Sequence, residues 1–421
     1  MARATGANAI LAGAFESIYG TPPGSGFRKL PFTSFNLGDE QNLVANDLLG
    51  YGREPLAPTL DVINNEGDVA VPVDLRNFGN WLKLFMAQPV TTASQAAGGN
   101  YLFSAQPAPS STITVAGVPW TFVSGSPSGN QTQIGANLAA TMTALASDLN
   151  ASVVAAIAAA TYSTTGGNKL VIVNDVLGTV GNSFTLAASG PSSAKASGAT
   201  LTGGANSHVF TSGAASLPSM SLECGLPEAP SYGMNYGVRG NTMRVALQRS
   251  GLLSATLGLI AQGETKASAS TAGTIAEGAV ERFSPFQGQV LRNGAPLGHV
   301  VSAEFAYSNN LDKVEVIRGD GRIEDADPGL VDMSGTIVVR FADTTLIDQA
   351  TSALPCALQF GWITDSGRSL VFNVPTVFLP KAKNPVTGPG GIQASFAWRA
   401  SREPTSGHAV TATLTNDVTA Y

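Results

Sequence analysis

The sequence has few charged residues: Lys, Arg, Asp and Glu make up 12% of its 421 residues, about half the usual share for a soluble domain. A chain of this length is expected to form two or three domains with a sizeable core. It has few charges, however, with which to cover an exposed surface. Because the cores of protein interfaces are depleted in charge, this scarcity predicts that much of the surface is buried in an assembly.

Cysteine is equally scarce, with only Cys224 and Cys356 in the chain. A disulfide-stapled secreted scaffold would have more, so we expect a fold held by its core, made in a reducing compartment, with both cysteines as small buried groups. No run of about 18 apolar residues suggests a membrane span. The N-terminal stretch is too weakly apolar to be a signal peptide.

Clusters of Lys or Arg are absent, and the net charge is −6 with a pI of about 5.1. Binding to nucleic acid depends on clustered cations that release phosphate counterions, so direct DNA binding is disfavoured. An acidic body that DNA passes without binding is compatible with this charge.

The sequence also lacks a catalytic constellation. Its three histidines, His208, His299 and His408, each stand alone in turn-like sequence, and no HExxH, CxxC, GxSxG or Walker A pattern occurs. We therefore expect solvated histidines, no enzyme activity, and no catalytic, metal-binding or cofactor-binding residues.

One segment, RGDGRIEDADPG, concentrates carboxylates: Asp320, Glu324, Asp325 and Asp327. This density could coordinate Ca²⁺, but the spacing is not that of an EF-hand loop, and two arginines of the same segment are available as partners. We expect a solvated loop, a salt-bridge patch between subunits or an acidic strip facing a lumen, rather than a metal site.

Glycine (47) and proline (24) are abundant, which favours many turns and short strands. Apolar and polar residues alternate with period two in HVVSAEFAYS, GTIVVRF, SLVFNVP and ASFAWRA, all in the last third of the chain. These patterns predict a mainly β fold, an antiparallel β-sandwich or barrel with one or two packed helices.

Three segments have helical periodicity. Residues 74–89 start with a capping residue, Asp74, and predict a helix that lies on a sheet with one apolar face. Apolar residues spaced by three or four predict a second helix over 134–149, and DTTLIDQATSAL predicts a shorter third one within 343–355.

Charge divides the chain into three segments. Residues 1–102 contain 6 Lys+Arg and 9 Asp+Glu, residues 103–205 contain two of each, and residues 206–421 contain 15 and 18. The middle segment is rich in Ala, Ser, Thr and Gly and has linker-like edges. We interpret 103–205 as a small α+β module inserted into a host domain formed by 1–102 and 206–421. The module is either an outward-facing decoration or a lateral contact.

The host segments resemble the tail tube (major tail) proteins of long-tailed bacteriophages. The resemblance lies in ESIYGTPPGSGFRKLPFTSFNLGDEQNLV, in GREPLAPTLDVINNEGDVAVPVDLRNFGNWLKLFMAQP, and in the succession of strands from LPSMSLECG to GQVLRNGAPLGHVVSAEFAYSNNLDK. Separately, the middle segment resembles a small module of phage virion proteins through TITVAGVPWTFV, an Ala-rich helix and GTVGNSFTL.

The resemblance implies a structural subunit that forms hexameric rings, each contributing strands to a continuous inner β-barrel. The rings stack into the tail tube through which the genome is ejected. Residues 47–65 would be a long loop between rings, with Arg53, Glu54 and Asp61 as candidates for inter-ring ion pairs. The N-terminal arm, up to about Gly20, would be disordered until assembly.

By the same resemblance, the partners are further copies of the chain, the terminator, tape measure and distal tail proteins, and a sheath if the tail contracts. DNA passes without specific binding, no membrane takes part, and no cofactor is implied. The protein would belong to the virion tail and be assembled in the host cytoplasm.

Three alternatives stay open. Another ring-forming tail component, such as a sheath subunit, terminator or minor tail protein, would share the same assembly physics. A non-viral surface or adhesive β-sandwich protein would use the Ser/Thr/Ala-rich module as a stalk or carbohydrate-binding domain, although we see neither a secretion signal nor an anchor. A β-sandwich hydrolase would need paired carboxylates on one concave face, whereas the dense acidic cluster lies in a turn.

Overall fold

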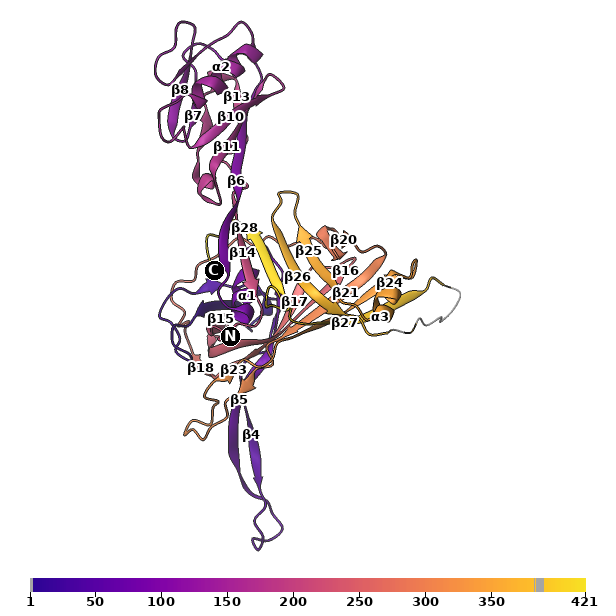
Figure 1. The fold of residues 1–421 in the computed structure, drawn as a ribbon. Helices are drawn as coiled ribbons and strands as arrows, with labels where there is room; N and C mark the ends of the chain where they lie inside the picture. The colour runs from indigo at the N-terminus through magenta and orange to yellow at the C-terminus, as the bar shows by residue number, and fades with distance from the viewer. Residues whose placement is uncertain (1–2, 382, 384–389) are drawn as a thin grey trace. The chain divides into compact units, whose positions relative to one another are not determined.

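The structure is a computed structural model that describes residues 3–381, 383 and 390–421. It divides into two compact units: unit 1 is formed by Met1–Pro89, Val209–Leu414 and Tyr421, and unit 2 by Val90–His208 and Thr415–Ala420. Antiparallel strands dominate both (Figure 1), so the prediction of a mainly β fold with a few helices is confirmed. The interpretation of 103–205 as an inserted module stays a prediction.

Unit 1 is built around two facing layers of antiparallel strands. The first layer has the order β3 (Ser34–Phe35), β5 (Leu56–Pro72), β17 (Ser254–Ile260), β16 (Ser231–Gln248), β21 (Val300–Ser308), β24 (Asp332–Arg340) and β27 (Gln393–Ala400). The second has the order β20 (Ala295–Pro296), β19 (Gly288–Arg292), β25 (Cys356–Ile363) and β26 (Ser369–Phe378). Within the described residues these layers form a sandwich and do not close into a barrel.

Aromatic rings from both layers meet between them. The ring of Phe305 in β21 lies 5.4 Å from that of Phe360 in β25 and 4.7 Å from that of Phe372 in β26. Phe360 stacks on Trp398 of β27 at 5.5 Å. All four side chains are buried, because alternate residues of a strand point to the same face. The apolar residues of the period-two pattern therefore form the inner surface of the sandwich.

The long strand β16 takes part in a further sheet of unit 1. Its first half pairs with β15 and β18, and its second half pairs with β17 and β21. Gly237 lies between the halves with φ of 64°, and a Cβ there would lie 2.8 Å from the side chain of Gln262, so glycine is required at this bend. The other strands of this sheet are β1 (Ile10–Phe15), β2 (Arg28–Lys29), β15 (Met220–Leu226) and β18 (Gly263–Ala267).

The N-terminal segment is part of this sheet, so the expected disordered arm is wrong for residues 10–15. Strand β1 pairs with β15 over six residues, and its centre is buried. Directly after it, the Glu16 carboxylate accepts hydrogen bonds from the hydroxyls of Ser219 and Ser221, both at 2.6 Å, and from the backbone N–H of Gly20 and Gly237. These four donors fix the segment to the body of unit 1.

The first helix, α1 (Phe78–Met86), is buried more completely than the sequence predicts. All its residues except Lys83 are buried, so it is a core helix rather than one with a single apolar face. The carboxylate of Asp74 accepts hydrogen bonds from the backbone N–H of Arg76 and Asn77, which lie in the turn before the helix. The N-cap residue is Asn77, and its side chain makes no capping bond, so the prediction of Asp74 as the cap is wrong. The helix packs against β16, where the ring of Phe85 lies next to Gly240.

The remaining elements of unit 1 are short. The third predicted helix is α3 (Thr345–Ser352), and Asp343 accepts a hydrogen bond from the N–H of Thr345 at its start. The others are η1 (Gly6–Asn8), η4 (Pro285–Gln287), β4 (Asp39–Asn46), β22 (Asp312–Lys313) and β23 (Ala326–Asp327), while β14 (Ala205–Thr211) and β28 (Thr411–Asn416) contribute residues to both units.

Unit 2 is an α+β unit with two small sheets. One contains β10 (Ala160–Thr165), β11 (Lys169–Leu177), β6 (Val90–Phe103) and β13 (Ala194–Ala196), and the other β12 (Leu186–Ala188), β7 (Thr112–Val115), β8 (Val118–Val123) and β9 (Gln131–Gln133). Two 3₁₀ turns, η2 (Val180–Ser183) and η3 (Gly190–Ser192), complete it.

The predicted second helix is α2 (Leu138–Asn150), which begins four residues later than its apolar pattern because Asn137 caps it through a bond to the N–H of Ala140. Its residues Met142, Leu145 and Leu149 are fully buried in the core of unit 2. None of the described helices in either unit is long and apolar enough to cross a membrane.

Candidate functional site

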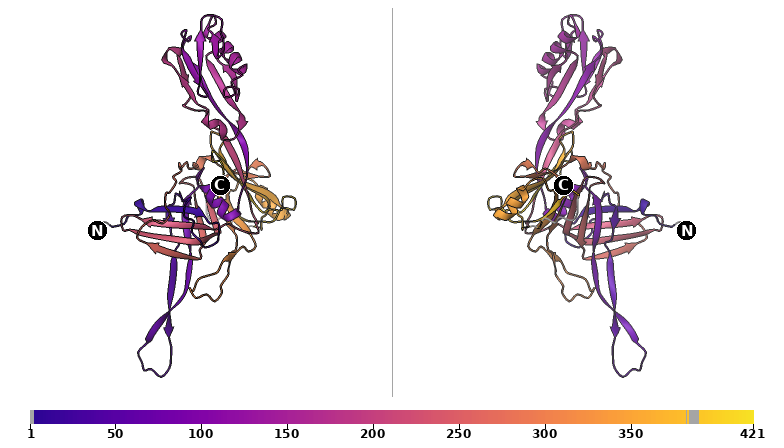
Figure 2. Two further views of the ribbon diagram at one scale, coloured as in Figure 1. Left: turned by 90° about the vertical axis from the view of Figure 1, so that its left-hand side faces the viewer. Right: turned by 90° about the vertical axis from the view of Figure 1, so that its right-hand side faces the viewer.

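The most exposed apolar element of unit 1 is the hairpin formed by β4 and the first half of β5. Figures 1 and 2 show this hairpin, in indigo and violet, extending away from the sandwich of unit 1. Leu43 and Leu60 face each other across the ladder, and they are 65% and 67% exposed. Val44 and Val62 are also exposed. A lone two-stranded hairpin is marginally stable in water, and these side chains lack the burial that normally holds apolar residues.

The tip of the hairpin, residues 47–55, continues this apolar surface. Leu48, Leu49 and Tyr51 are 60%, 94% and 67% exposed. The charged candidates Arg53 and Glu54 lie in the same tip and are exposed; neither forms an ion pair with a described residue. The tip therefore combines three large apolar side chains with unpaired charges.

Residues 56–65 form the first half of β5, so the sequence-based prediction of a continuous loop over 47–65 is wrong for that half. The third charged candidate, Asp61, lies in this strand. Its backbone carbonyl accepts a hydrogen bond from Gln41 Nε2 at 2.6 Å. The structure thus groups Arg53 with Glu54 but places Asp61 farther along the hairpin. That these three residues form ion pairs between rings stays a prediction.

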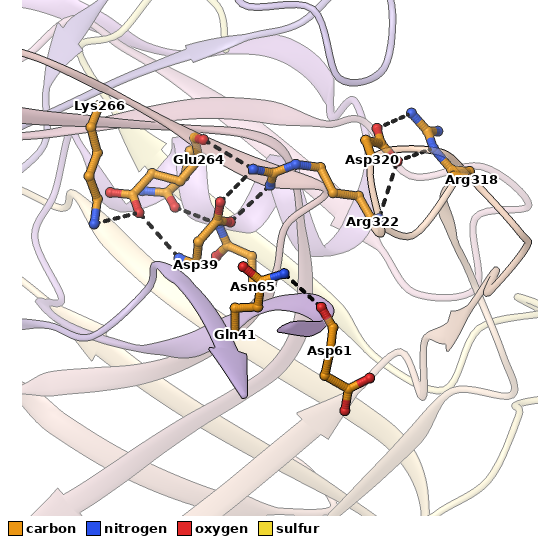
Figure 3. Close-up of polar contacts among 10 residues, drawn as sticks. Asp39, Gln41, Asp61, Asn65, Glu264, Lys266, Arg318, Asp320 and Arg322 are labelled. Carbon is orange, nitrogen blue, oxygen red and sulfur yellow. Dashed lines mark hydrogen bonds and ion pairs between the residues drawn. The ribbon is translucent and has the colours of Figure 1, made fainter. Parts of the chain in front are cut away.

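The hairpin is anchored at its root by an ion pair (Figure 3). The guanidinium of Arg322 donates to both carboxylate oxygens of Asp39, at 2.6 and 3.0 Å, and only 14% and 20% of these side chains are exposed. Asn65, at the same level of the other strand, donates to Asp39 at 2.9 Å and to Asn235 at 2.8 Å. A bidentate, largely buried ion pair of this kind fixes the position of both side chains and also stabilises the fold.

The backbone reinforces this anchor. Glu264 of β18 accepts a hydrogen bond from the N–H of Asp39 at 3.2 Å and lies 3.6 Å from the ammonium of Lys266. The N–H of Ile63 donates to the carbonyl of Gly321 at 2.9 Å. The hairpin is thus rigidly held where it leaves the sandwich and unsupported beyond that point.

The acidic segment that the sequence analysis singled out is the loop that supplies this anchor. Asp320 forms an exposed pair with Arg318 at 2.8 Å, and the hydrogen bonds from Arg318 lower the pKa of the Asp320 carboxyl. Asp325 pairs with Arg239 at 3.1 Å. Two of the four acidic candidates are therefore neutralised within the chain.

The side chains of the other two acidic candidates form no hydrogen bond or ion pair within the described part of the chain. The backbone N–H of Glu324 donates to the carbonyl of Val314, and its carbonyl accepts a hydrogen bond from Gln262 Nε2. Asp327 lies in β23 opposite Asp312. No group of three His, Cys, Asp or Glu side chains that could hold a metal ion occurs among residues 3–381, 383 and 390–421. An intersubunit or lumen-facing role for these carboxylates stays a prediction.

The role of Arg322 could not be predicted from the sequence. Its neighbours in the acidic segment are the expected partners of this arginine, whereas its partner Asp39 lies 283 positions away. No local pattern marks such a pair, because only the tertiary fold brings the loop to the base of the hairpin. The apolar tip does have a local signal in the sequence: the apolar run LLGY lies between turn residues.

The histidines lie in three different settings. His208 is fully buried in unit 2, where it bonds to Thr91, Asn416 and the carbonyl of Val418, so the expectation of a solvated side chain is wrong here. Burial lowers the pKa of its imidazole, which favours the neutral form. His299 lies in a turn with φ of 61°, and His408 bonds to the carbonyl of Ser212. The bonds of His208 link β14 to β6 and β28.

A comparison of the sequence with models of protein families gives a match. The model described as phage tail tube protein matches residues 6–400, nearly the whole chain. No match was found among curated proteins. The family match extends across both units and favours the tail tube interpretation over a surface adhesin or a hydrolase.

Proposed function

The chain belongs to the phage tail tube protein family, a family of structural virion components, and we propose that it forms hexameric rings that stack into the tube of a long-tailed phage. The observation that carries the stacking is the hairpin of β4 and β5. Its root is fixed by Asp39 and Arg322, and its leucines and valines are exposed. An exposed apolar surface of this kind favours contact with another protein surface, here the next ring.

The charge distribution supports a ring. Stable obligate interfaces bury upwards of roughly 2,000 Å² and are poor in charge, and only 12% of this chain is charged. When identical subunits make a head-to-tail contact, the contacts close into a ring if the rotation between subunits allows it. Strands of successive subunits then line a continuous inner β-barrel.

The tube serves as the conduit for genome ejection. A net charge of −6 without clustered Lys or Arg supports passage of DNA without specific binding, because phosphate contacts depend on cations. The ends of the tube contact the terminator, tape measure and distal tail proteins, and a sheath surrounds it if the tail contracts. Assembly takes place in the host cytoplasm, and the inter-ring contacts include Arg53, Glu54 and Asp61.

Electron microscopy of the purified chain tests this function. We expect tubes whose end views have six-fold symmetry and whose side views repeat along the axis. A chain that stays monomeric at all concentrations and salt conditions would contradict the proposal, and so would single rings that never stack.

We propose that the module comprising most of unit 2 is dispensable for the tube. The side chain of Thr91 bonds to His208 at 2.8 Å, and that of Ser94 bonds to the carbonyl of Ala205 at 3.0 Å. Joining Ser94 to Ala205 through an Asn-Gly turn, which suits a two-residue hairpin, therefore removes the module while keeping these pairs. We expect tubes of unchanged repeat and smaller outer diameter by electron microscopy. A folded variant without tubes would place unit 2 in the tube wall.

A further inference from the structure

Unit 1 has an open cavity of about 1040 Å³ at the end of the sandwich where β16 ends and β17 begins. Its size is slightly above the usual range for ligand pockets. The lining is mainly apolar and includes Leu252, Phe286, Val301 and, at its inner side, Trp362. Leu252 is 68% exposed and Phe286 83% exposed, so the cavity and its rim present a large uncovered apolar surface.

The charges around this cavity have one sign. Arg249 and Arg340 line it together with His299, and no aspartate or glutamate does. Neither arginine forms an ion pair with a residue that the structure describes. A segment that fills the cavity well would therefore present apolar side chains flanked by carboxylates.

The tip of the hairpin has this chemistry. Leu48, Leu49 and Tyr51 supply the apolar side chains, and Asp47 and Glu54 lie on either side of them in the sequence; with Arg53 beside Glu54, the tip has a net charge of −1. A second exposed apolar pair, Val316 and Ile317, also lies between acidic residues, but the tip has three large apolar side chains. It complements the cavity in both polarity and charge.

The tip of a chain lies far from its own cavity, at the opposite end of the same strand. Ser254, which lines the cavity, is paired with Pro72 at the end of β5, while the other end of β5, Leu56, leads into the tip. At a rise of about 3.3 Å per residue the strand spans roughly 50 Å. Copies that follow one another along the direction of β5 would bring the tip of one towards the cavity of the next.

We propose that the hairpin tip of one copy binds in the β16–β17 cavity of a copy in the adjacent ring. The inference rests on the proposed stacking of rings and names the surface that receives the hairpin. The contact joins two different surfaces of the same chain, so it is heterologous and repeats without limit along an axis, which is the symmetry of a tube. It covers both exposed apolar surfaces at once and places the carboxylates of the tip near the arginines of the rim.

Aspartate substitutions on either side of the contact test the proposal by negative-stain microscopy and sedimentation. Leu49→Asp and Leu252→Asp change exposed side chains, so both variants should fold. Each alone should form rings that stack into tubes only at a concentration at least tenfold higher than the unmodified chain needs. An equimolar mixture should form particles with a single ring-to-ring junction, because one variant keeps its cavity and the other its tip. The control is Val153→Asp, which changes a residue of unit 2 that is 97% exposed and should form normal tubes.

A cysteine pair gives a direct measure of proximity. In Leu49→Cys/Leu252→Cys tubes, oxidation should produce a ladder of disulfide-linked chains on a non-reducing gel, while each single variant should stay monomeric on the gel. Tubes of the double variant without a ladder, together with normal tubes from Leu252→Asp, would overturn the cavity as receptor and leave the stacking intact. Absence of tubes from the unmodified chain would instead overturn the proposed function, and this inference with it.

Discussion

Replacing residues 42–62 by an Asn-Gly turn should leave a folded chain that no longer forms tubes. The replacement keeps Asp39, Gln41 and Asn65 at the root, where Gln41 is paired with Ile63, and a two-residue turn suits such a hairpin. It removes the exposed leucines and the tip. Because the deleted part contributes little to the core of unit 1, the Tm should change little, whereas electron microscopy should show single rings only.

A pair of point substitutions checks that the apolar side chains, rather than the length of the hairpin, are responsible. In Leu43→Ser/Leu60→Ser the two facing leucines become polar. If each leucine is buried on assembly, its loss weakens the stacking contact by about 1.5–3 kcal/mol, which is at least roughly tenfold in the concentration needed for tubes. Val153→Ser, at a still more exposed position of unit 2, should have no effect. Tubes formed normally by the serine pair would contradict a stacking role for the hairpin.

Removing the ion pair at the root of the hairpin should lower both the stability of the chain and its ability to form tubes. Arg322→Ala leaves the largely buried carboxylate of Asp39 without its ion partner, and breaking such a pair costs about 3 kcal/mol. We expect a Tm several degrees lower, faster hydrogen exchange at the amides of β4 and residues 63–65, and tubes that form only at higher concentration. Exchange measured by mass spectrometry on peptides from this region is the specific readout.

The same loop offers a matched control. Arg318→Ala also removes an arginine from an ion pair, but its partner Asp320 is exposed and the pair is local, two residues apart. Exposed pairs contribute little to stability, so the Tm and the exchange of β4 should match those of the unmodified chain. Equal destabilisation by both substitutions would show that the loop acts as a whole and that the Asp39 pair has no special role.

Much of the fold could be predicted from local patterns. Period-two alternation marks β21, β24, β26 and β27 because their inner side chains face a common core, and the apolar spacing within 74–89 marks the α1 region. The errors concern burial. Residues 10–15 look like a weakly apolar arm, yet they complete a sheet with β15. His208 looks like a turn residue, yet strands separated by more than a hundred residues enclose it.

The candidate site was predictable only in part. The charged tip residues Arg53 and Glu54 and the acidic loop were visible in the sequence, as was the family resemblance, which the family match supports. The hairpin geometry was not, because the pairing of β4 with β5 depends on a register that turns and bulges set. The pairing of Arg322 with Asp39 was not predictable either, since nothing local relates residues 283 positions apart.

The low share of charged residues predicts that the protein assembles with other subunits. By itself, the sequence determined the mainly β character, the lack of a recognisable catalytic set and the expectation of buried interfaces, because these follow from composition and short-range periodicity. Only the tertiary structure decided which surface is left uncovered. Exposure is a property of the folded chain, and folding leaves the leucines of the hairpin and the β16–β17 cavity open at opposite ends of β5 while it buries similar residues elsewhere.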